Sequence, residues 1–128
     1  MSEKKQIVMT AMTELIGKGN LAAVEPLLRA DFVDHNPQVA TTSRAAWLDN
    51  FRDFPLREMK IDIQQLVAEG DYVTMFSRRW LPGGDVIAVA DVFRFAGELV
   101  AEHWEVVQPL GDDDPNPLAT LGSVPARG

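Results

Sequence analysis

The 128-residue sequence contains no cysteine, only two histidines and no long apolar run. The lack of cysteine excludes disulfides, thiolate metal sites, iron–sulfur clusters and thiol nucleophiles, so the fold must depend on packing alone. No apolar stretch approaches the roughly 20 residues that a membrane-spanning helix needs. The N-terminal residues also lack the apolar segment and cleavage site of a signal peptide. The expected location is therefore cytoplasmic.

Positive charge is scarce as well, because 12 Lys and Arg residues face 19 Asp and Glu residues, which gives a net charge of −7. The basic residues form no cluster larger than the pairs Lys4-Lys5 and Arg78-Arg79. Nucleic acids and anionic membranes attract basic surfaces, so we expect neither as a partner. The length is that of one domain.

Hydrophobic periodicity changes halfway along the chain. Three segments of the first half have the apolar spacing, caps and stops of helices: 3–16, 21–29 and 44–54. Four segments of the second half have strand character and are separated by turn residues: 59–64, 72–81, 86–95 and 99–108. Helices followed by strands with short connections predict an α+β fold with an antiparallel sheet. Residues 1–110 would form this domain, and 111–128 would be a flexible, acidic tail containing Pro and Gly.

One carboxylate lies in an otherwise apolar row of the penultimate strand. Asp91 shares its face with Val89 and Phe93, among other apolar residues. Burying this group without a partner would cost several kcal/mol or force it to take up a proton. Asp91 therefore has a bonded partner, a raised pKa or access to a pocket.

The last strand places His103 and Glu105 on one face because alternate residues of a strand point the same way. If residues 96–98 form a three-residue loop with Gly97 in the left-handed conformation, Asp91 lies directly opposite His103. A two-residue loop would bring Glu102 or Trp104 opposite Asp91 instead. We favour the three-residue loop.

The second histidine, His35, precedes Asn36-Pro37 in a distant part of the chain. A histidine beside carboxylates can move protons near neutral pH, but the same pairing can simply satisfy a half-buried ring. His35, Asp91, His103 and Glu105 could also ligate a metal, yet no histidine spacing supports this, and we expect none. The aromatic residues Trp47 and Phe51 have core spacing; they either cover the sheet or line a cavity for an apolar ligand.

These segments together resemble the SnoaL-like proteins of the NTF2-like superfamily. The resemblance covers about residues 3–110 and rests on the order of elements, on D-F-V-D-H-N-P, and on D-V-F-R-F-A-G-E-L-V-A-E-H-W-E-V-V-Q-P. Where the family often has E-H-W-D, this chain ends the motif with Glu105, one methylene longer. The resemblance implies a cone in which three N-terminal helices pack on a strongly curved antiparallel sheet. It also implies a homodimer that pairs through the sheet.

Relatives with this fold include polyketide cyclases, ketosteroid isomerase, scytalone dehydratase and limonene epoxide hydrolase, which perform acid–base chemistry on apolar substrates without a cofactor. The resemblance thus implies catalytic roles for Glu105, Asp91, His103 and His35. Asn36, Trp47, Phe51 and Phe93 would bind an apolar small-molecule substrate, and no cofactor is expected. The leading hypothesis is proton abstraction next to a carbonyl, as in a cyclase, isomerase or lyase. The alternatives are a non-catalytic binding module and a dimeric scaffold.

Overall fold

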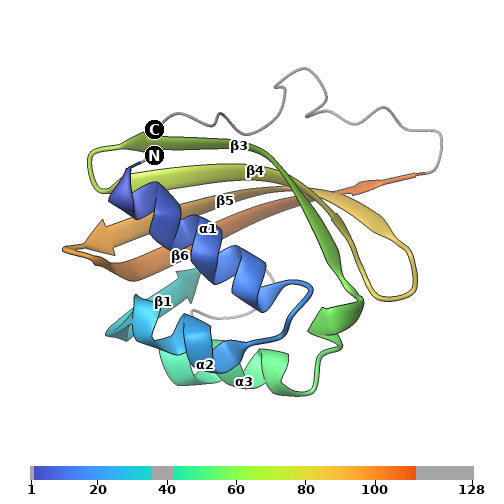
Figure 1. The fold of residues 1–128 in the computed structure, drawn as a ribbon, viewed down its shortest axis with the longest axis horizontal. Helices are drawn as coiled ribbons and strands as arrows, with labels where there is room; N and C mark the ends of the chain where they lie inside the picture. Colours follow the sequence, from blue (N-terminus) through green and yellow to red (C-terminus); the bar gives the residue numbers. More distant parts are fainter. Residues whose placement is uncertain (1, 36–41, 112–128) are drawn as a thin grey trace.

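The computed structural model describes residues 2–35 and 42–111, in which helices cover one face of a six-stranded sheet (Figure 1). The helical elements and strands alternate only in the first half of the chain. The helices are α1 (Glu3–Leu15), α2 (Leu21–Val24) and α3 (Arg44–Arg52), with single 3₁₀ turns at Glu25–Leu27 and Leu56–Glu58. The strands are β1 (Leu28–His35), β2 (Thr42–Ser43), β3 (Lys60–Glu69), β4 (Tyr72–Trp80), β5 (Val86–Ala96) and β6 (Leu99–Leu110). No helix in these ranges has the length and apolar character that a membrane crossing requires.

Local sequence signals set the helix starts. The hydroxyl of Ser2 accepts a hydrogen bond from the backbone N–H of Lys5, and that of Ser43 accepts one from Ala46, as expected of N-caps. The second helix is shorter than predicted: it ends at Val24, and Pro26 lies in the following 3₁₀ turn. Because proline lacks a backbone donor, the helix does not continue, and the next residues enter β1.

The sheet has the strand order β2-β1-β6-β5-β4-β3 and is mixed, which corrects the expectation of a purely antiparallel sheet. β1 runs parallel to β6, whereas all other neighbours are antiparallel. The parallel pair arises because the last strand of the meander, β6, returns to lie beside β1, which precedes the meander in the chain. The sheet is also not strongly curled: β2 and β3 stand at opposite ends of the strand order, and the long strands β3 to β6 bend gently over α1 (Figure 1). The expected α+β class and the three helices are confirmed.

The core lies between the helices and the sheet face that they cover, which we call the inner face. Val8 of α1 and Val73 of β4 are fully buried there, and Phe32 of β1 is 2% exposed. Full burial of such a side chain contributes roughly 1.5–3 kcal/mol to folding. The core therefore fixes the sheet against α1 and determines which side chains face inward. Residues 112–128 of the predicted tail lie outside the described residues.

The β5–β6 hairpin differs from the predicted register. Ala96 pairs with Leu99, so the turn has two residues, and Gly97 at its first position has φ 64°. Phe95 pairs with Val100 and Arg94 with Glu102, which leaves one extra residue, Ala101, as a bulge. A two-residue turn alone would reverse the faces of β6; the bulge reverses them again.

The bulge decides which residues meet. Asp91 lies opposite Glu105 and Phe93 lies opposite His103, so the predicted Asp91–His103 pairing is wrong. The prediction that His103 and Glu105 share a face is confirmed, because both line the inner side of the sheet. The hairpin thus places Asp91 of β5 beside His103 and Glu105 of the adjacent strand β6.

Candidate active site

A cavity of about 170 Å³ lies between the helices and the inner face of β4, β5 and β6. Most of its wall is apolar and comes from α1, α3, the Leu56–Glu58 turn and the sheet. These apolar residues are Met12, Leu15, Ile16, Trp47, Phe51, Phe54, Leu56, Met59, Leu81 and Ile87. The wall also carries four polar side chains: Arg79, Asp91, His103 and Glu105. An apolar pocket with a few convergent polar groups is the usual form of a small-molecule site.

His103 lies between two carboxylates. Its Nδ1 is 2.6 Å from Asp34 Oδ1, and its Nε2 is 2.7 Å from Asp91 Oδ1. Burial alone would lower the pKa of His103, but hydrogen bonds to Asp34 and Asp91 and their negative charges outweigh it and raise the pKa to about 9. The ring is therefore positively charged at neutral pH, with both nitrogens donating.

Asp91 links this histidine to an arginine. Its second oxygen, Oδ2, accepts from Arg79 Nη2, and Arg79 Nε donates to the buried Ser77 Oγ at 3.1 Å. Burial would raise the pKa of Asp91, but the charges of Arg79 and His103 hold it below its usual value. Since the side chain is fully buried and both oxygens are engaged, Asp91 is an ionised organising group and is not free to act as a base.

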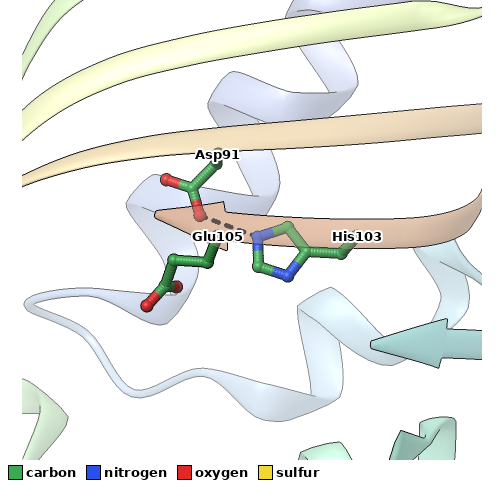
Figure 2. A group of neighbouring side chains, drawn as sticks. All are labelled: Asp91, His103 and Glu105. Atoms are coloured by element: carbon green, nitrogen blue, oxygen red, sulfur yellow. Dashed lines mark hydrogen bonds and ion pairs between the residues drawn. The ribbon is translucent and has the colours of Figure 1, made fainter. Parts of the chain in front are cut away.

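Glu105 differs from Asp91 in being open to the cavity. Its side chain is 38% exposed, and the one ion pair that the structure gives it is a long contact of 3.7 Å to Arg79 Nη1. Burial and the negative charge of Asp91 raise the pKa of Glu105 above its usual value. Figure 2 shows its carboxylate turned away from the Asp91–His103 hydrogen bond. A carboxylate with a raised pKa beside an apolar wall is suited to accept and return a proton.

The predicted aromatic residues surround this polar group. Trp47 and Phe51 line the cavity, with their ring centroids 4.9 Å apart. Phe93 does not line this cavity, so the predicted substrate contact is wrong; its ring instead lies 4.8 Å from that of His103, and Trp47 lies 6.4 Å from the same ring. These rings hold the imidazole in place and shield it from water.

His35 does not join the predicted cluster, so its expected position is wrong. Its Nε2 lies 2.7 Å from Glu102 Oε2, and its ring stacks on Trp104 at 4.9 Å. Asp34 and His35 are adjacent in β1 and so point to opposite faces; it is Asp34 that reaches His103. Asn36 lies outside the described residues.

Sequence reasoning missed two members of the site, Asp34 and Arg79. The alternation of side chains along a strand could have identified each of them. Asp34 shares a face of β1 with the buried Phe32, and adjacent strand residues such as Arg78 and Arg79 must point to opposite sides. The signal in β1 was hidden because its short stretch before Pro37 could equally be a loop.

Asp91, His103 and Glu105 also have metal-ligand chemistry, with donor atoms within 4.8 Å of one another. The arrangement does not favour a cation, however. Arg79 already provides a positive charge to both carboxylates, and Nε2 of His103 carries a proton toward Asp91. A metal would have to displace both interactions.

Comparison with known proteins supports the resemblance in the sequence. A comparison with curated proteins finds no match. Among solved structures, a candidate ketosteroid isomerase from Kribbella flavida is 17% identical, with a TM-score of 0.74 over 98% of this chain and 92% of that one. IdmH, a candidate polyketide cyclase from Streptomyces antibioticus, is 18% identical, with a TM-score of 0.67 over 84% and 93%.

AclR, a candidate hydroxylase from Streptomyces galilaeus, is 18% identical, with a TM-score of 0.69 over 84% of this chain and 90% of that one. At these identities the likeness shows the fold alone. The family is shown by a sequence match: residues 9–103 fit the SnoaL-like domain. The chain therefore belongs to the SnoaL-like domain family and has an NTF2-like structure.

Proposed function

We propose that this protein is a cofactor-free enzyme in which Glu105 removes a proton from the carbon next to a carbonyl of an apolar substrate. The observation that carries the proposal is the Glu105 carboxyl, which is open to an apolar cavity and has a raised pKa. A base works best when its pKa lies near the working pH. Abstraction of this kind begins cyclase, isomerase and aldol-type reactions.

The remaining polar groups prepare the site for this step. Asp91 and Asp34 hold His103 at both nitrogens, and Asp91 also holds Arg79. Asp34, His103, Asp91 and Arg79 thus form a hydrogen-bonded row. This row keeps the positive charges of His103 and Arg79 fixed beside Glu105 during the reaction, which is electrostatic preorganisation. His103 acts as a positioning residue here, because neither nitrogen is free to contact the substrate.

The cavity suits a small ring. An engineered cavity of about 150 Å³ in another protein holds benzene, and the present cavity has about 170 Å³. Trp47 and Phe51 offer aromatic faces, on which a flat, apolar substrate can pack. The space that remains between these side chains favours a ligand site over a vestigial scaffold.

A binding module remains the second candidate because the row from Asp34 to Arg79 is hydrogen-bonded within itself. Such a row could anchor a ligand without changing it. Native mass spectrometry of the protein mixed with small aromatic ketones separates the two functions. A ligand retained unchanged supports binding alone, and turnover supports the enzyme.

The direct experiment measures hydrogen–deuterium exchange at the α-carbon of small ketones. Replacing Glu105 by Gln keeps its shape but removes the base, so we expect the exchange rate to fall by about 10²–10⁴-fold. Glu102→Gln is the matched control, because Glu102 lies on the same strand with its side chain bonded to His35 and Arg94 on the other face.

The pH dependence adds a second criterion. The rate should rise as pH increases through the raised pKa of Glu105, because only the ionised carboxylate can accept the proton. Equal exchange rates in the wild type and Glu105→Gln would reject the proposed base.

A further inference from the structure

Proton abstraction next to a carbonyl leaves a negative charge on the carbonyl oxygen, and that charge needs a donor. His103 cannot provide one, since both of its nitrogens are bonded to carboxylates. His35 cannot either, because its ring lies on the opposite face of the sheet. The donor must therefore be another group of the cavity wall that has an unused N–H.

Arg79 is that group. Its Nε donates to Ser77 and its Nη2 to Asp91, which fixes the plane of the guanidinium. Its Nη1 makes no hydrogen bond within the described residues, because its contact with Glu105 Oε2 is 3.7 Å long, too far for a hydrogen bond. A guanidinium anchored at two nitrogens therefore presents its third nitrogen toward the cavity, directly beside the proposed base.

We propose that Arg79 Nη1 binds the substrate oxygen that becomes negative, so that Arg79 and Glu105 act as a pair. This inference rests on the proposed function. In the step, the α-carbon proton moves to the Glu105 carboxylate, the C–H electrons form a C=C bond, and the carbonyl π electrons move to the oxygen. The oxygen receives hydrogen bonds and positive charge from Arg79, and reversal at the same or another carbon returns the proton.

The charges around Arg79 are compatible with this role. Asp91, His103 and Asp34 form an internally paired row, and Glu105 becomes neutral when it takes the proton. The oxyanion thus gains its charge as the neighbouring carboxylate loses its own. The 3.7 Å between Nη1 and Glu105 Oε2 requires the oxygen and the acidic C–H to be close neighbours. The substrate class is therefore an enolisable ketone, aldehyde or β-dicarbonyl compound.

The inference is tested with 4-nitrophenol, whose anion carries a full charge on an oxygen attached to a flat ring and has a distinct colour. The experiment uses the Glu105→Gln variant, in which the proposed base is absent and no turnover interferes. An apolar cavity by itself would raise the pKa of the bound phenol. A cation in contact with its oxygen lowers the pKa, typically by about one to three units.

We expect absorbance titration to show a bound phenol pKa at least about one unit below that of free 4-nitrophenol. An unchanged or raised value overturns the inference. This result is independent of the exchange assay: a lowered phenol pKa together with exchange that does not need Glu105 rejects the proposed base and keeps the oxyanion site.

Two variants assign the effect to Arg79. Arg79→Lys, made in the Glu105→Gln background, keeps a positive charge for Asp91 but loses the planar fork, so most of the pKa shift should disappear. Affinity for 4-nitroanisole, which has no ionisable oxygen, should remain. Arg78→Lys is the control, because the Arg78 guanidinium lies over the Trp80 ring at 4.7 Å, on the other side of β4. If Arg79→Lys does not fold, the sign of the shift in Glu105→Gln still decides the question.

Discussion

The two faces of the sheet carry almost the same set of polar residues around the β5–β6 hairpin, with different consequences. On the inner face, Arg79, Asp91 and His103 form a chain of ion pairs. On the outer face, Arg94, Glu102 and His35 form a similar chain, with Arg94 Nε 2.5 Å and His35 Nε2 2.7 Å from Glu102. Each chain joins an arginine to a histidine through one carboxylate.

Burial separates the two chains. The three inner side chains are at most 7% exposed, whereas the three outer ones are 26–33% exposed. Water screens the outer charges, so the pairs there contribute little to stability. The inner charges cannot be solvated and depend on one another, and they adjoin an apolar cavity. Residue type therefore does not define the site; desolvation beside a cavity does.

Removing the central carboxylate of each chain should expose this difference most strongly. Asp91→Asn leaves Arg79 and His103 buried with an uncompensated charge, and we expect a loss of about 3–5 kcal/mol in the free energy of unfolding. Glu102→Gln removes the equivalent group of the outer face and should cost no more than about 1 kcal/mol. Urea denaturation of the two variants measures both values. Similar losses would contradict the comparison.

The two chains can also be compared through the pH dependence of stability, because each contains one histidine. The pKa of His103 is raised from 6.5 to about 9, so its contribution to stability is complete below pH 6.5 and disappears as pH rises to about 9. Within that window each pH unit should cost up to about 1.4 kcal/mol. Thermal or urea unfolding at a series of pH values measures the slope, which should be lost in His103→Gln. It should persist in His35→Gln; a slope that follows His35 instead would refute the assignment.

The smallest expected effect concerns the outer face, where the resemblance predicts that two copies of the chain pair. Val67, Tyr72 and Val106 are 46%, 46% and 71% exposed there. Val106→Lys should reduce dimerisation in light scattering and change monomer stability by no more than about 0.5 kcal/mol. Val107→Lys, at the neighbouring position that points the other way, should leave the dimer intact. A monomeric wild type would reject the prediction.

Local patterns predicted much of this protein because the responsible interactions are local. The cap at Ser2, the cap at Thr42 or Ser43, of which the structure uses Ser43, and the apolar strand character of residues 86–95 are short-range properties of the chain. The row of apolar residues around Asp91 also indicated that this carboxylate needs a partner, and Arg79 and His103 are such partners.

The failures have long-range causes. The bulge at Ala101 has no local signature, yet it determines what lies opposite Asp91. Asp34 is missing from the predicted site because β1 joins β6 across most of the chain, and nothing near residue 34 indicates that pairing. A period of two identifies which residues share a face, but not which strand will be the neighbour.

The sequence by itself determined the SnoaL-like family, the order of helices before the strand meander, and the presence of carboxylates and histidine among apolar strand residues. It also excluded thiol chemistry, because there is no cysteine. Only the tertiary structure decided that His103 and not His35 faces the cavity, and that Glu105 and not Asp91 is open to it. The reason is physical: the sequence specifies the type of each side chain, whereas the solvation and partners of that side chain depend on which distant strand packs beside it.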